Sequence, residues 1–142
     1  RWTGLDAIIR DAGLDAIAML APASSKERRQ LAIENGSGFI YQMAVAGVTG
    51  ARQTVAAELE SRVRSLRAMT SLPVVAGFGI STPDHIRDVC RYADGAIVGS
   101  ALVGQLADDQ RSGLPKADMI ARLSDAVRAF AAATVRAETA NA

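Results

Sequence analysis

Cysteine, aromatic residues and an excess of charge of either sign are scarce in this chain of 142 residues. Cys90 is the only cysteine, so no intrachain disulfide forms, and a reducing compartment is compatible; we expect the cytoplasm. The 16 basic residues nearly balance the 15 acidic ones, which gives no reason to expect a nucleic-acid or membrane surface. No apolar run approaches the ~20 residues of a transmembrane helix, and no spacing of side chains indicates a metal site.

Aromatic residues make up only 4% of the chain, whereas hydrophobic residues make up 49%. This content predicts a folded core rather than disorder. Ala, Val, Ile and Leu fill that core, and small and branched side chains of this kind suit an α/β fold. The length is enough for one domain with a core of its own.

Four short apolar runs predict buried strands. They are continuous rather than alternating, which favours strands that are buried on both faces, as in a parallel sheet. The predicted strands are residues 16–20, 39–43, 74–78 and 96–98.

Helical patterns separate these runs. Ser24 and Ser25 are start signals for a helix at Lys26–Asn35, and Gly36 is a stop signal. Residues 55–69 form a second helix with an apolar stripe at spacings of four, four and three, namely Val55, Leu59, Val63 and Leu66.

Three further helices are expected. Thr82-Pro83-Asp84 has an N-cap residue, a first-turn proline and an early acid, and therefore starts a helix. A helical pattern also follows Ser100, and the last helix covers residues 116–135. Alternation of strands and helices implies a parallel sheet with right-handed crossovers.

The pentapeptide Gly-Leu-Asp-Ala-Ile occurs twice, at residues 4–8 and 13–17. We interpret the first copy as helix that ends near Gly13, and the second copy as the entry to the first strand. Two short strands are the alternative interpretation.

Ligands of parallel α/β folds bind at the carboxyl ends of the strands, where this chain places glycine-rich segments. These segments are Gly47-Val48-Thr49-Gly50, Gly77-Phe78-Gly79-Ile80-Ser81 and Gly99-Ser100. Backbone N–H groups near Gly50, Gly79 and Ser100 are able to bind a phosphate, because glycine leaves room for close approach. From the residues alone, two alternatives stay open: a helix N-cap without ligand at Gly99-Ser100, and a tight turn at Gly77–Gly79.

The same edge is poor in groups for acid–base catalysis. The segments at the strand ends contain no carboxylate, histidine or cysteine, and the phenol of Tyr41 is a poor base at neutral pH. Asp15 and Asp94 precede their strands and belong to the opposite edge. His85 is expected on the surface, away from these loops, and Cys90 in the core.

Five motifs in order resemble the tryptophan synthase alpha chain, a (β/α)8 TIM barrel. The resemblance covers about residues 5–130, and its five motifs are Leu20-Ala21-Pro22, Gly38-Phe39-Ile40-Tyr41, Gly47-Val48-Thr49-Gly50-Ala51-Arg52, the segment at residues 73–83, and the segment at residues 95–103. The resemblance implies the C-terminal half of that barrel, about four β/α units. We therefore expect one partial TIM-barrel domain at residues 1–142, with a frayed tail at 136–142.

The resemblance also implies an activity and a site. The family is a lyase of tryptophan biosynthesis that cleaves indole-3-glycerol phosphate to indole and glyceraldehyde 3-phosphate. By resemblance, the substrate phosphate contacts Gly50, Gly79, Gly99 and Ser100, and Gly77 and Phe78 shape the loop. Thr49 matches a threonine on a mobile loop that helps to position a catalytic aspartate, and Tyr41 matches a tyrosine that lines the site.

The resemblance implies no cofactor for this chain; the family's partner is a beta chain that uses pyridoxal phosphate. The family's catalytic glutamate and aspartate lie in the front half of the barrel, and nothing here matches them. Ala44 stands where the family often has serine. We therefore expect the chain alone to be inactive.

Four strands are too few to close an eight-stranded barrel. An isolated half exposes sheet edges and an unburied face, so we expect it to join the missing N-terminal half or a second copy, or to be marginally stable. The alternative function is a non-catalytic phosphate-binding half-barrel that acts as a homodimer. A sugar-phosphate isomerase of the same superfamily is disfavoured, because the Gly-Val-Thr-Gly loop and Tyr41 both fit the alpha chain.

Overall fold

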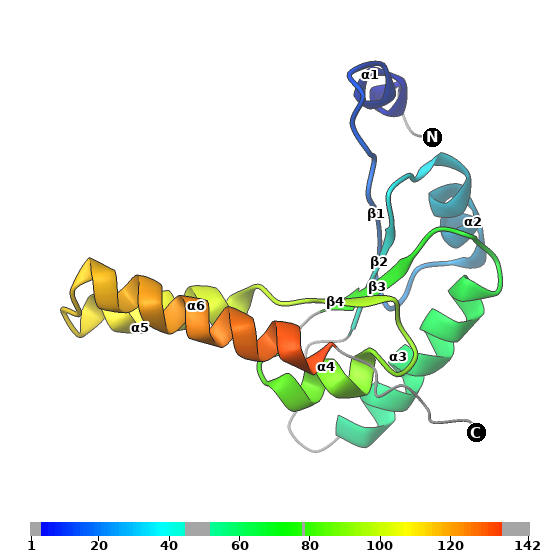
Figure 1. The fold of residues 1–142 in the computed structure, drawn as a ribbon. Helices are drawn as coiled ribbons and strands as arrows, with labels where there is room; N and C mark the ends of the chain where they lie inside the picture. Colours follow the sequence, from blue (N-terminus) through cyan, green and yellow to red (C-terminus); the bar gives the residue numbers. More distant parts are fainter. Residues whose placement is uncertain (1–3, 45–51, 78, 135–142) are drawn as a thin grey trace, which may run out of the picture.

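The structure is a computed structural model that describes residues 4–44, 52–77 and 79–134. Its centre is a four-stranded parallel sheet in the order β1-β2-β3-β4, so each strand pairs with the next strand along the chain (Figure 1). The strands are β1 Ala18–Leu20, β2 Ile40–Met43, β3 Val74–Gly77 and β4 Gly95–Ile97. The expected α/β fold with a parallel sheet is confirmed.

Helices follow the strands in the expected alternation. They are α1 Leu5–Asp11, α2 Lys26–Asn35, α3 Arg52–Arg67, α4 Pro83–Val89, α5 Ser100–Arg111 and α6 Lys116–Ala133. The first copy of the pentapeptide lies at the start of α1 and the second leads into β1, as expected. The expected frayed tail lies outside the described residues.

Side-chain caps fix the starts of two helices. Ser25 caps α2, because its hydroxyl accepts the Arg28 N–H at 3.3 Å. Thr82 caps α4 in the same way, accepting the His85 N–H at 3.3 Å, and Pro83 occupies the first turn. These local signals explain why both starts are predictable from the sequence.

The core lies between one face of the sheet and the helices that cover it. On that face the side chains of β1, β2 and β3 are buried, and the helix stripe of α3 packs against them. The buried residues of the strands are Ala18, Leu20, Ile40, Val74 and Ala76, and those of the stripe are Leu59, Val63 and Leu66. The side chain of Val55, the fourth predicted member of the stripe, lies outside the described residues.

The described residues cover the other face of the sheet only in part. Met19 on β1 is 53% exposed, and Tyr41, Val75 and Ile97 on the same face are only partly buried. The expectation of strands buried on both faces is therefore wrong for this chain. An unburied face is what an isolated half of a barrel exposes, because the strands that would close over it are absent.

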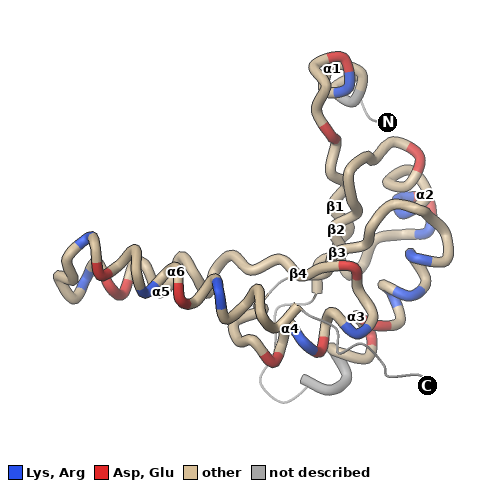
Figure 2. The backbone as a smooth tube through the Cα atoms, in the orientation of Figure 1, with Lys and Arg blue, Asp and Glu red and all other residues tan. Residues whose placement is uncertain are grey.

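A hairpin of α5 and α6 projects away from the sheet and contacts α4 through α6 (Figure 1). Several of its large apolar side chains are exposed, including Val103, Ile120 and Val127. Basic and acidic residues nevertheless alternate along it (Figure 2). Within the described residues, no helix combines the length and apolar character needed to span a membrane.

The amino ends of β3 and β4 are tied together by Asp94. Its Oδ2 accepts the Val74 N–H at 2.9 Å, and its Oδ1 pairs with the Arg67 guanidinium at 3.1 Å. Arg67 also donates to the Tyr92 carbonyl at 3.1 Å. The prediction that Asp94 lies at the edge opposite the glycine-rich segments is confirmed.

Tyr92, beside this network, gives a test in alkaline solution. Burial, followed by the charges of Glu60 and Asp88, raises the pKa of Tyr92 to about 12, against an ordinary value near ~10. The folded state holds the phenol proton more tightly than the unfolded state does. The contribution of Tyr92 to the free energy of unfolding is therefore fully present below pH ~10 and is lost as the pH rises towards 12. Urea unfolding between pH 9 and pH 12 measures the loss.

The control for this prediction is Tyr92→Phe, which has no proton to lose at this position. We expect the wild-type chain to lose more stability than the variant across the same pH range. Parallel pH profiles for the two chains would contradict the assigned role of Tyr92.

Candidate functional site

The carboxyl ends of the four strands form the edge where the site was predicted. Because all strands are parallel, the segments after Leu20, Met43, Gly77 and Ile97 leave the sheet on the same side. Gly77 is paired with Ile97 across β3 and β4. Gly79 lies two residues after Gly77, and Gly99 lies two residues after Ile97. The structure thus brings the second and third glycine-rich segments to neighbouring positions.

Tyr41 and Gly77, two predicted site residues, are in direct contact. A Cβ added at Gly77 would lie 3.0 Å from both Cε2 and the hydroxyl oxygen of Tyr41, and 2.8 Å from Cβ of Ile97. The Tyr41 ring therefore occupies the space that a side chain at position 77 would need. Glycine at this position is explained by that close approach.

Gly79 has a conformational reason to be glycine. Its φ of +70° lies in the left-handed region, which side chains with a Cβ rarely adopt. Among the described residues other than its chain neighbours, no atom lies within 4 Å of the place where its Cβ would be, so this part of the chain leaves the backbone open there. The turn and the open space are compatible with both interpretations of this segment, a simple turn and a phosphate loop.

The N-terminus of α5 carries N–H donors that have no acceptor among the described residues. Gly99 is the N-cap and has no side chain, whereas α2 and α4 are capped by Ser25 and Thr82. The N–H groups of Leu102 and Val103 both donate to the Gly99 carbonyl at 3.1 Å. Within the part of the chain that the structure describes, the N–H groups of Ser100 and Ala101 have no acceptor.

The N–H donors at the start of α5 make the strand-end edge suitable for binding an anion. Free N–H groups at a helix N-terminus, together with the partial positive charge of the helix dipole, favour an anion. Ser100 is exposed and adds a hydroxyl at the same place. Three other predicted site residues, Thr49, Gly50 and Phe78, lie outside the described residues.

The expectation that His85 lies away from the loops is wrong, whereas its expected place at the surface agrees with its partial exposure. Its ring is partly buried, and its Nδ1 accepts the Ser81 N–H at 3.4 Å. The reason is the cap of α4: Thr82 fixes the first turn so that the side chain four residues after Ser81 reaches back to that amide. A histidine therefore supports the loop after β3, through a contact that spacing alone did not reveal.

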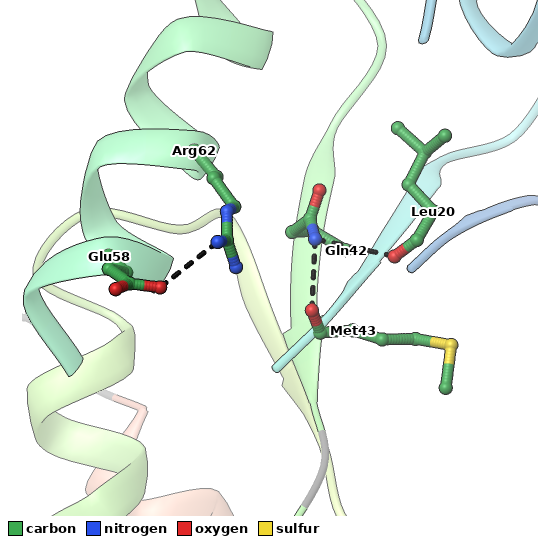
Figure 3. A network of polar contacts seen from close by, with 5 residues as sticks. All are labelled: Leu20, Gln42, Met43, Glu58 and Arg62. Atoms are coloured by element: carbon green, nitrogen blue, oxygen red, sulfur yellow. Dashed lines mark hydrogen bonds and ion pairs between the residues drawn. The ribbon is translucent and has the colours of Figure 1, made fainter. Parts of the chain in front are cut away.

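Gln42 is the polar residue that the sequence analysis missed. It lies on β2 and is only 2% exposed. Its Nε2 donates to the Leu20 carbonyl at 3.3 Å and to the Met43 carbonyl at 2.9 Å, with the Glu58–Arg62 pair on the neighbouring α3 (Figure 3). The available signal was a single amide side chain inside the apolar run at residues 39–43.

Among the described residues, no group of histidine, cysteine and carboxylate side chains has the arrangement of a metal site. The described strand-end segments also contain no carboxylate. The donors on this edge are thus mainly backbone amides and hydroxyls, which bind anions rather than cations.

The model of one protein family, the tryptophan synthase alpha chain, matches residues 3–135. This chain belongs to the tryptophan synthase alpha chain family. An alpha chain of Chloroflexus aurantiacus is 42% identical over 123 residues, which are 87% of this chain and 44% of that protein. An alpha chain of Geotalea daltonii is 43% identical over 127 residues, or 89% of this chain and 47% of that protein.

Solved structures give the same result. Tryptophan synthase of Mycobacterium tuberculosis is 32% identical, with a TM-score of 0.71 over 93% of this chain and 46% of that one. An alpha chain of Legionella pneumophila, at 23% identity, supports the fold alone, with a TM-score of 0.78 over 96% of this chain and 48% of that one. This chain spans less than half the length of these family members, so the expected half of a TIM barrel is confirmed.

Gly77 allows a test of the contact with Tyr41. We expect Gly77→Ala to lower the free energy of unfolding by about 1–3 kcal/mol, because the new methyl group overlaps the Tyr41 ring and Ile97. Urea unfolding measures the change.

Gly95→Ala is the matched control on the neighbouring strand. Its Cβ would lie 3.6 and 3.7 Å from the Val75 methyl groups, which is ordinary contact, so we expect no loss of stability. Equal losses in the two variants would show that the space beside Tyr41 does not decide the residue at position 77.

Proposed function

We propose that this chain supplies the phosphate-binding part of a lyase that cleaves indole-3-glycerol phosphate to indole and glyceraldehyde 3-phosphate. The observation that carries the proposal is the uncapped N-terminus of α5, where Ser100 and Ala101 present N–H groups without acceptors among the described residues. Membership of the alpha chain family supports the assignment of these donors to a substrate phosphate.

The substrate phosphate lies between the loop after β3 and the start of α5. Gly79 and Gly99 leave the backbone open on both sides, since no atom of the described residues beyond their chain neighbours lies within 4 Å of either Cβ position. Ser100 donates from its amide and its hydroxyl, and the dipole of α5 stabilises the dianion. Gly77 permits the close packing of Tyr41, which lines the site next to the phosphate loop.

The remaining members of the site come from the family resemblance. Gly50 contacts the phosphate, Phe78 shapes the loop together with Gly77, and Thr49 helps to position a catalytic aspartate of the barrel's front half. These three residues lie outside the described part of the chain.

Proton transfer in this reaction requires groups from outside the chain. Cleavage of the carbon–carbon bond needs an acid and a base within hydrogen-bond reach of the substrate, and the described strand-end segments carry no carboxylate. We assign these groups to the N-terminal half of the barrel. The other partner is a tryptophan synthase beta chain, which holds pyridoxal phosphate and receives indole in the cytoplasm.

A second candidate is a non-catalytic phosphate-binding half-barrel that pairs with a second copy. The partly covered face of the sheet, with Met19 at 53% exposure, favours a covering partner of some kind. Both candidates share the phosphate site, so the first experiment addresses that site.

Ser100→Asp separates anion binding from helix stability. A carboxylate at this position repels a phosphate, whereas the same charge in the first turn of α5 is favourable for the helix. We expect the affinity for glyceraldehyde 3-phosphate to fall at least tenfold (about 1.4 kcal/mol) without loss of stability. Calorimetric titration and urea unfolding give the two quantities.

Ser100→Asn is the neutral control of matched size, and we expect its affinity to stay within about threefold of the wild-type chain. Unchanged affinity in Ser100→Asp would contradict the proposal that the phosphate binds at the start of α5. A matching loss in both variants would show that the hydroxyl, not the charge, decides binding.

Catalysis by the chain alone is a separate prediction. We expect these 142 residues to release no indole from indole-3-glycerol phosphate, because the acid and the base are not at the strand-end edge. Fluorescence or chromatographic detection of indole, with a complete alpha chain as the positive control, measures this. Indole release by the purified chain would place catalytic groups within it.

A further inference from the structure

Gln42 has an unusual position for an amide side chain. It is 2% exposed on the covered face of β2, in register with Leu20 on β1 and with Ala76 on β3. Buried amides are retained where they satisfy other buried polar groups, since an unpaired one is costly. The two acceptors of its Nε2 group, the carbonyls of Leu20 and Met43, identify what it satisfies.

The backbone of β2 explains why the Met43 carbonyl needs a donor. The N–H groups of Ile40 and Ala44 donate to the carbonyls of Pro73 and Gly77, both at 2.9 Å, so the backbone N–H and C=O groups of even-numbered residues in β2 point towards β3. The backbone N–H and C=O groups of the odd-numbered Met43 therefore point towards β1.

The register of β1 then identifies the donor that is missing. Leu20 is paired with Gln42, so in a regular parallel ladder the Met43 carbonyl would accept a hydrogen bond from the N–H of residue 22. Residue 22 is proline, which has no N–H to give. The Gln42 Nε2 group lies 2.9 Å from the Met43 carbonyl oxygen and donates to it instead.

We propose that Gln42 is a positioning residue that replaces the ladder donor lost at Pro22 and thereby holds the carboxyl ends of β1, β2 and β3 in place. The contacts form a line across three strands. Gln42 joins Leu20 of β1 to Met43 of β2 (Figure 3), and the next residue, Ala44, donates to Gly77 of β3.

This line ends at the edge that carries the candidate site. Gly77 is the residue against which the Tyr41 ring packs, and the loop with Gly79 follows it. We call the contacts of Gln42 with Leu20 and Met43, together with the Ala44–Gly77 hydrogen bond, the backbone clamp. The expected effect of this clamp on ligand affinity rests on the proposed function, whereas the clamp itself does not. The two statements are therefore tested by different measurements on the same chain.

Amide hydrogen exchange of Ala44 tests the clamp in Gln42→Met, which keeps the length of the side chain but has no donor. We expect the protection of the Ala44 N–H to fall about tenfold, because the strand end opens more often. The Ile40 N–H, bonded to Pro73 at the other end of β2, is the internal control and keeps its protection. Equal losses at both amides, or none at Ala44, would overturn the proposal.

Two further variants complete the design. Gln30→Met, at an exposed glutamine on α2, controls for the change of residue type and leaves Ala44 unaffected. Pro22→Ala restores an N–H at position 22, and we expect it to return Ala44 of Gln42→Met to near wild-type protection. If Gln42→Met does not fold, the double variant is expected to fold; an unfolded or unprotected double variant contradicts the replacement of Pro22.

Titration with inorganic phosphate separates this proposal from the proposed function. If the wild-type chain binds no phosphate, the proposed phosphate site is overturned. The clamp is then accepted or rejected on the hydrogen-exchange result alone. If the wild-type chain binds, we expect Gln42→Met to bind at least threefold more weakly and the double variant to recover. Unchanged affinity in Gln42→Met would overturn its role in positioning the site.

Discussion

The parallel course of the four strands decides where each candidate residue lies. In a parallel sheet the carboxyl ends of all strands share one edge, so segments far apart in the sequence leave the sheet together. The matched pair of Gly77 and Ile97 brings Gly79 and Gly99 to neighbouring positions in this way. A single antiparallel strand would have carried its glycine to the opposite edge.

The two edges of the sheet differ in how their polar groups are satisfied. At the amino ends, Asp94 accepts the first N–H of β3 and pairs with Arg67, so both polar groups have partners within the fold. At the carboxyl ends, the start of α5 keeps N–H groups without acceptors among the described residues. Donors of this kind at a helix N-terminus favour an anion as ligand.

Local signals made much of the fold predictable. Ser25 and Thr82 act within one helical turn of their own chain, so the starts of α2 and α4 follow from the sequence. The first strand was predicted two residues too early, because the Ala16 N–H donates to the Ser37 hydroxyl at 2.8 Å, not to a strand. That bond joins residues 21 positions apart, and no local pattern reveals it.

The candidate site was predictable to a similar degree. The glycine motifs indicated the edge, and the structure adds the Tyr41–Gly77 contact and the uncapped start of α5. Gln42 and His85 were missed for the same reason: their roles depend on which backbone amide or carbonyl the fold brings to them. The central claim is that the strand-end edge of this chain binds a phosphate through backbone amides.

The most direct test is to record amide NMR shifts of the wild-type chain during titration with inorganic phosphate. The account predicts saturable shifts at Ser100, Ala101 and Gly79, next to the free donors of α5. A rival place for an anion is the cleft of about 310 Å³ beside Arg67, Thr70 and Asp94, at the opposite edge. Shifts confined to that cleft, or no saturable shifts at all, would contradict the account.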